Sequence, residues 1–169
     1  PWAYRRKARL SLRDVPAKGR VLVGFRERDG RFVTDMVECH TLVPALAQQL
    51  PALSELVGAL HARDRIPQIE AAFGEQEGAL VVRHLEPLDD HDRRCLLGFE
   101  AETGIRVYGQ AAGPDSVQPL AGEASCLHYE LPEFDLRIAF EPLDFVQVNA
   151  GLNRLMVSRA VELLAPGPG

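Results

Sequence analysis

The chain has 169 residues, of which 46% are hydrophobic and 25% are charged. These values are typical of a soluble globular protein with one main domain, and no apolar run approaches the roughly 20 residues that a membrane-spanning helix needs. The composition therefore excludes a disordered chain and an integral membrane protein. The formal net charge of −5 ordinarily argues against a nucleic-acid partner, because phosphate contacts need lysine and arginine.

The charges are distributed unevenly along the chain. Through His40 there are 10 Lys/Arg against 5 Asp/Glu, a balance of +5, whereas the remainder holds 9 against 19, a balance of −10. Such an asymmetry indicates one basic surface on an acidic body. A nucleic-acid contact near the start of the chain is therefore compatible with the acidic total.

The first residues carry charges without an apolar segment behind them and without an initiator methionine. They predict an internal position in a longer protein rather than a signal peptide. The three cysteines, Cys39, Cys95 and Cys126, are odd in number and too few for a secreted disulfide framework. We therefore expect a reducing, cytoplasmic location.

Residues 4–13 alternate in character. Tyr4, Ala8, Leu10 and Leu12 share one face of a predicted strand, interrupted only by Arg6. The opposite face is cationic and polar and consists of Arg5, Lys7, Arg9, Ser11 and Arg13. Residues 20–27 and 31–37 predict two further strands around the Asp29-Gly30 turn, so the chain is expected to open with a small antiparallel sheet.

Helical and strand patterns then alternate. Residues 43–62 have helical spacing, and Pro51 is expected to kink or divide that helix. A second helix is expected from the cap at residues 88–90 to Gly104, and a third from Ala150 to about Leu164 with Asn149 as its cap. The third helix is expected to bury Leu152, Leu155, Met156 and Leu163. Strands are expected at residues 66–73, 78–85, 105–111, 127–131 and 134–140.

Hairpins interleaved with helices predict an α+β fold, with antiparallel β hairpins packed against α-helices, rather than a doubly wound parallel sheet.

The basic strand face has two interpretations. Cationic side chains at period two match a row of phosphates, which predicts an RNA contact, but an ordinary solvated sheet face has the same pattern. The first acidic residue is Asp14, and this favours RNA. Arg26, near the end of the second predicted strand, extends the basic set.

The other candidate residues mostly have structural interpretations. A lone cysteine such as Cys39 is more often a small buried hydrophobe than a metal ligand, and without a CxxC motif the chain cannot build a zinc or iron–sulfur site by itself. Cys95 is expected on the apolar face of its helix, in the core of the protein. The acids Asp89, Asp90 and Asp92 suit a helix N-terminus. No glycine-rich phosphate loop is present.

Five stretches of the sequence are distinctive: YRRKARLS (4–11), VGFR (23–26), Cys39, RHL (83–85) and DFVQVNAG (144–151). Together they resemble the bacterial RNA uracil-5-methyltransferases, and most of all those that modify one uridine of 23S ribosomal RNA. The resemblance covers essentially the whole chain. The segment from Phe145 to Gly151 is its most specific part.

The resemblance implies that residues 1–142 are a central, RNA-binding, iron–sulfur-associated domain. Residues 143–169 would then begin a truncated, Rossmann-like methyltransferase domain. By position, Cys39 matches the fourth ligand of a [4Fe-4S] cluster whose other ligands precede this sequence. Gln147 matches a residue that helps to hold S-adenosyl-L-methionine, and Phe145 lies in the same segment.

In this family a cysteine thiolate adds to C6 of the uracil and a base later removes the C5 proton. Neither group is matched here, so the resemblance implies an inactive chain by itself, binding neither cofactor, within an active full-length enzyme. Ribosomal RNA is the implied partner, and a monomer is expected. The alternative is a non-catalytic RNA-binding or interaction module.

Overall fold

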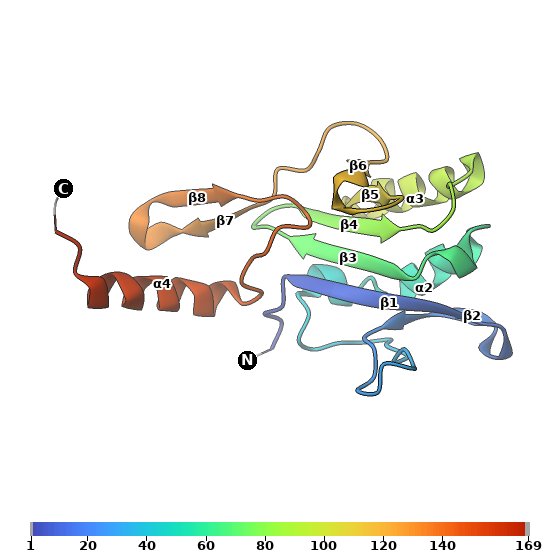
Figure 1. Cartoon of the computed structure of the whole chain (residues 1–169), viewed down its shortest axis with the longest axis horizontal. Helices are drawn as coiled ribbons and strands as arrows, with labels where there is room; N and C mark the ends of the chain where they lie inside the picture. Colours follow the sequence, from blue (N-terminus) through green and yellow to red (C-terminus); the bar gives the residue numbers. More distant parts are fainter. Residues whose placement is uncertain (1, 168–169) are drawn as a thin grey trace.

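A computed structural model describes residues 2–167 (Figure 1). Its main feature is a six-stranded sheet in the order β2-β1-β3-β4-β5-β6. The strands are β1 (Lys7–Val15), β2 (Arg20–Gly24), β3 (Gln68–Phe73), β4 (Gly78–Arg83), β5 (Arg106–Gln110) and β6 (Val117–Pro119). Only β4 and β5 pair in parallel, and all other pairs are antiparallel. The α+β fold class is therefore confirmed.

Two helices cover one face of this sheet. Helix α2 (Leu50–Ala59) and helix α3 (Asp90–Thr103) contribute Leu53 and Leu96 to a core that also contains Leu10 of β1. Helix α3 is capped by the Asp89 side chain, which accepts a hydrogen bond from the Asp92 N–H, and it ends at the left-handed Gly104. Both ends are where the sequence places them.

The predicted alternation of β1 is confirmed. Ala8, Leu10 and Leu12 are buried against the helices, whereas Arg9 and Arg13 are exposed on the opposite face. Ser11 lies between them and is buried, so the polar face is not continuously open to solvent. On the same side of the sheet, over β3, β4 and β5 rather than β1, lies a second apolar cluster that includes Val81, Tyr108 and Leu127.

The third strand predicted at residues 31–37 is not formed. The segment returns along β2, and the Thr34 N–H donates to the Phe25 carbonyl at 2.8 Å, but only one isolated bridge joins Arg26 and Val33. A side chain on Gly24 would overlap the Thr34 carbonyl oxygen. The return segment therefore approaches the glycine too closely to continue a regular ladder.

The helix predicted over residues 43–62 is divided, as Pro51 suggested. A short helix, α1 (Pro44–Ala47), precedes α2, and Pro51 occupies the first turn of α2, where its missing N–H costs nothing. The short strand β6 was not predicted.

A second unit extends from one end of the sheet (Figure 1). Strands β7 (His128–Leu131) and β8 (Leu136–Ala139) form a separate hairpin, and helix α4 (Ala150–Leu164) runs beside it with Asn149 as its cap. No helix of residues 2–167 has the length and apolar character needed to span a membrane.

The expected burial of the α4 leucines is wrong. Leu152, Leu155, Met156 and Leu163 are between 50% and 70% exposed. The helix instead turns Asn153 and Arg154 toward the body of the protein. Its apolar face is not covered by any of the described residues. The prediction was wrong because the periodicity specifies an apolar stripe but not which partner covers it.

Candidate functional site

Three candidate segments meet at the N-terminal end of β1. The Arg5 N–H donates to the Thr41 carbonyl at 2.8 Å, and the Arg5 carbonyl accepts from the Val43 N–H at 3.1 Å. On the other side, the Arg6 N–H donates to the Val148 carbonyl at 2.9 Å. The start of the basic strand thus lies between the segment after Cys39 and the segment 144–149.

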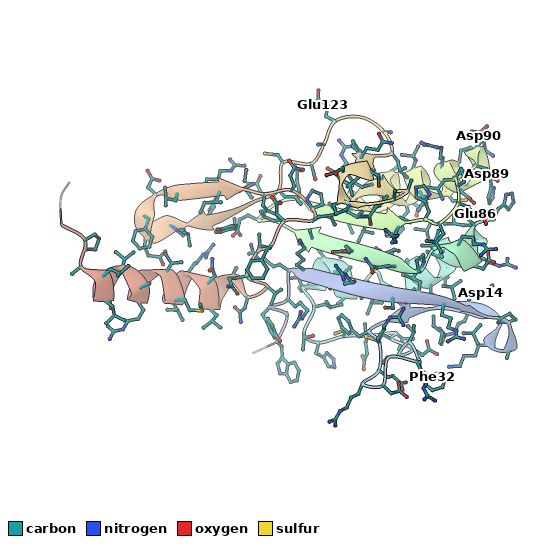
Figure 2. All side chains as sticks on the ribbon, in the orientation of Figure 1. Asp14, Phe32, Glu86, Asp89, Asp90 and Glu123 are labelled. Atoms are coloured by element: carbon teal, nitrogen blue, oxygen red, sulfur yellow. The ribbon has the colours of Figure 1, made fainter. Side chains whose placement is uncertain are left out.

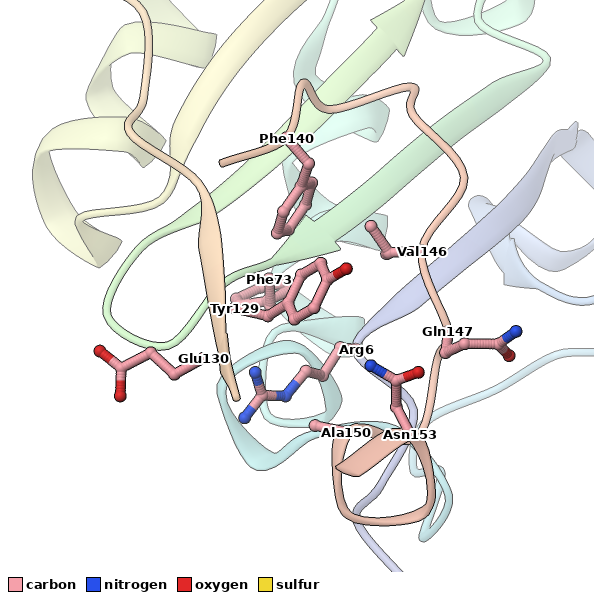
Figure 3. A pocket seen from close by; sticks show the side chains of 9 residues that line it. All are labelled: Arg6, Phe73, Tyr129, Glu130, Phe140, Val146, Gln147, Ala150 and Asn153. Atoms are coloured by element: carbon pink, nitrogen blue, oxygen red, sulfur yellow. The ribbon is translucent and has the colours of Figure 1, made fainter. Parts of the chain in front are cut away.

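Gln147 borders two cavities at this junction. The larger, of about 420 Å³, is also lined by Arg5, Thr41 and Asn153. The smaller lies between Gln147 and the Tyr129–Phe140 ring pair, and Figure 3 shows Gln147 across it from Glu130. An amide side chain here can both donate and accept hydrogen bonds toward a polar ligand.

Phe145 lies in the same segment and is 85% exposed. A large aromatic side chain with so little cover is suited to contact another surface or a nucleobase. Lys7 holds the start of this segment, because its ammonium group donates to the Asp144 carbonyl. Burial lowers the pKa of Lys7, an effect that Glu70 and Asp144 partly oppose.

Cys39 lies close to this junction and is half-buried. Its thiol is 3.3 Å from the Thr41 hydroxyl and borders an open, largely apolar cavity of about 590 Å³ lined also by Trp2 and Leu42. Burial raises the pKa of the thiol, but hydrogen bonds from Thr41 and from the Leu42 backbone, together with the Arg5 charge, outweigh it and lower the pKa. The thiolate form is thereby favoured, which is the form that binds metal.

Cys39 does not lie in a cysteine cluster. Among residues 2–167, the only group of His, Cys, Asp and Glu side chains close enough to hold a metal ion is His61, Asp89 and Asp92. An iron–sulfur cluster needs several thiolates, and among residues 2–167 the Cys39 thiol is the only one at this place. The single thiol at an open, apolar cavity fits one ligand position of such a cluster and no more.

The five predicted RNA-binding residues are placed differently from one another. Arg9 and Arg13 project from the open face of β1, Arg9 paired with Glu70 at 3.0 Å and Arg13 donating to the Arg31 carbonyl. Arg26 lies in the following loop and donates to the Gly30 carbonyl. Arg5 and Lys7 instead face the junction with residues 144–149.

The His61 group lies elsewhere. The His61 ring is 2.7 Å from Asp89, whose hydrogen bond and charge raise the pKa of His61. Figure 2 shows Asp89 and Asp90 at the end of the molecule opposite α4. This group caps α3 and is separate from the junction around Gln147.

The chain has close sequence relatives. It is 52% identical over 168 residues to a 23S rRNA (uracil(1939)-C(5))-methyltransferase RlmD of Bordetella pertussis, and 46% identical over 166 residues to that of Stenotrophomonas maltophilia. A third, from Xanthomonas axonopodis, is 44% identical over 167 residues. These alignments cover 98–99% of this chain. The chain belongs to this family of 23S rRNA uracil-5-methyltransferases.

The chain spans a little over a third of the length of these family members, between 36% and 38%. No family model matches it. In structure it is similar to the Pyrococcus abyssi tRNA (uracil-54, C5)-methyltransferase solved with S-adenosyl-L-homocysteine, with a TM-score of 0.67 at 16% identity. That similarity covers 96% of this chain and 41% of the other, and it shows a shared fold.

Three side chains at the junction around Gln147 were not predicted from the sequence, namely those of Arg6, Glu75 and Arg154. Arg6, which only interrupted an apolar face, pairs with Glu75 of the β3–β4 turn, and Arg154 of α4 pairs with the same carboxylate. A charged residue on an apolar strand face was the one available signal, since such a residue needs a partner.

Thr41→Val tests the environment of Cys39. The substitution keeps the side-chain volume but removes the hydroxyl that stabilises the thiolate, so the pKa of Cys39 should rise. Alkylation of Cys39, followed by mass spectrometry from pH 6 to 10, should be slower at neutral pH and shift its midpoint to higher pH. Cys126, which lies away from Thr41, serves as the internal control; an unchanged Cys39 profile would contradict this account.

Proposed function

We propose that the whole protein transfers a methyl group from S-adenosyl-L-methionine to C5 of a uridine in 23S ribosomal RNA. In this proposal the present chain binds and positions the RNA. The observation that carries the proposal is 52% identity, over 99% of the chain, to a relative named for that reaction. The junction supports it, because the basic strand and residues 144–149 are hydrogen-bonded to each other.

The proposed roles divide the chain at about residue 142. Residues 1–142 form the central RNA-binding domain, and residues 143–169 begin the methyltransferase domain. The exposed apolar face of α4 supports this boundary, since a helix with such a face is stable only against a further apolar surface. The longer relatives contain ample additional chain to supply one.

The proposed contacts with the cofactor and the target base come from residues 144–149. Gln147 would hold S-adenosyl-L-methionine through its amide, and Phe145 would pack beside the reacting groups. When bound, that cofactor supplies an electrophilic methyl group. This chain's own part is to fix Gln147 through the Arg6–Val148 hydrogen bond and the Asn149 cap.

Cys39 is proposed as one ligand of a [4Fe-4S] cluster, with the remaining cysteines supplied from outside this chain. The support is a thiol with a lowered pKa at an open cavity. Because Thr41 and Leu42 pair with the start of β1, the cluster would stabilise the end of the basic strand.

The direct test is methyl transfer by the full-length protein. Unmodified 23S rRNA transcript incubated with radiolabelled S-adenosyl-L-methionine should gain one 5-methyluridine per molecule, identified by nuclease digestion and mass spectrometry. Residues 1–169 alone should transfer none, since the family's nucleophile is not matched in them. Tight RNA binding by the full-length protein without methyl transfer would favour a non-catalytic RNA-binding module instead.

Arg9 and Arg13 should bind phosphates of the RNA backbone. Replacing both by glutamine in the full-length protein should weaken RNA binding and reduce the slope of log K against log salt by about one for each phosphate that is no longer neutralised. Filter binding between 50 and 300 mM KCl measures this slope. Arg159→Gln, on the far part of α4, is the matched control. An unchanged slope in the double variant would contradict the proposal that Arg9 and Arg13 of β1 contact RNA phosphates.

Cys39→Ser should remove the iron–sulfur cluster. Serine keeps the shape of the side chain but is a poor iron ligand, so full-length protein purified without oxygen should lose most of its iron and acid-labile sulfide. Cys126→Ser is the control and should keep both. Normal iron and sulfide content in Cys39→Ser would show that Cys39 is not a cluster ligand and would favour a role in packing.

A further inference from the structure

Glu75, in the turn between β3 and β4, accepts hydrogen bonds from two arginines. Arg6, immediately before β1, donates through both terminal nitrogens, Nη1 to Oε1 at 2.9 Å and Nη2 to Oε2 at 3.0 Å. Arg154 of α4 donates from Nη2 to Oε1 at 3.1 Å. The three side chains are only 20–33% exposed, so water screens them less than it would a surface pair.

The same residues also bind the β7–β8 hairpin. The Glu75 N–H donates to the His128 carbonyl at 3.0 Å, and Arg154 Nε donates to the Glu130 carbonyl at 3.1 Å. Glu75 thus connects four elements that are far apart in sequence. The forked contact from Arg6 restricts orientation as well as distance, and Arg154 adds a single hydrogen bond to the same carboxylate.

The Arg154–Glu75 contact is one of the polar contacts that join helix α4 to the body of the protein. Helix α4 packs on the body through Asn153 and Arg154, while its leucines face away. The helix begins immediately after Asn149, so a change in its tilt moves residues 144–149. Without the Glu75 charge, Arg6 and Arg154 would repel each other across the gap that the carboxylate now fills.

We infer that Glu75 is a positioning residue: its carboxylate couples β1, with its RNA-facing arginines, to α4 and so sets the position of Gln147. The inference rests on the function proposed above. Hydrogen bonds from Arg6 hold the pKa of the Glu75 carboxyl below its ordinary value against the effect of burial, so the carboxylate is charged at neutral pH.

The test uses the full-length protein with Glu75→Gln, Arg154→Gln and the double variant. Each single change should reduce kcat/KM about tenfold, through a higher KM for S-adenosyl-L-methionine, a lower kcat, or both. The reason is that a small displacement of a binding group weakens transition-state stabilisation. The dissociation constant for the RNA should stay within about twofold of wild type. The double variant should be no worse than the worse single one, as expected for partners in one interaction.

Arg159→Gln is the control within the same helix, since among residues 2–167 the one ion pair of Arg159 is with Glu162, one turn away. Its kinetics should equal those of the wild type. Arg154→Gln leaves the Arg6–Glu75 pair intact and so tests the coupling even if Glu75→Gln folds poorly. Kinetic constants within twofold of wild type in both single variants would overturn the inference. It would also be overturned if the single variants lost RNA affinity and melting temperature together with kcat/KM, because that pattern indicates general destabilisation.

Hydrogen exchange gives a readout that does not need activity. Peptides covering residues 144–153 should exchange faster in Glu75→Gln and Arg154→Gln than in wild type or Arg159→Gln. If the wild type transfers no methyl group but this difference is present, the proposed function fails and the coupling stands. If the wild type is active and exchange is unchanged, the coupling fails alone.

Discussion

The register of β1 is the constraint on which most of this structure depends. The strand pairs with β2 along one edge and with β3 along the other, so every side chain in it has an assigned face. A slip of one residue would send Leu10 and Leu12 to solvent and bury Arg9 and Arg13. Burial of the leucines thus places Arg9 and Arg13 on the opposite face, and no additional contact is needed to orient them.

The two residues immediately before β1 organise the junction. Arg5 and Arg6 hydrogen-bond to the segment after Cys39 and to residues 144–149. A single extended stretch therefore carries the basic surface at one end and connects two candidate sites at the other. In the function proposed above, this arrangement holds the segments proposed to contact RNA and S-adenosyl-L-methionine in one hydrogen-bonded frame.

Helix α4 shows how an amphipathic pattern can be satisfied in two stages. Its polar side is already fixed by Arg154 and the Asn149 cap, whereas its leucines remain exposed. The polar contacts orient the helix, whereas burial of the exposed leucines would supply most of the stabilisation. Such a division suits the domain boundary proposed above at about residue 142.

The sequence by itself determined the features whose cause lies in a few adjacent residues. The alternation of β1, the division of the helix at Pro51, the Asp89 and Asn149 caps and the left-handed end at Gly104 all follow from local backbone and side-chain preferences. The matched segments around Phe145 and Cys39 also identified the family.

Only the tertiary structure decided how distant residues meet. Arg6 and Glu75 are 69 positions apart and Glu75 and Arg154 are 79 apart, so no local pattern links them. The return segment after Gly30 left the ladder because Thr34 approaches Gly24, and the α4 leucines stayed exposed because no described element reaches them. Local preferences fix which groups a segment offers, but the packing of the whole chain fixes which partner each group finds.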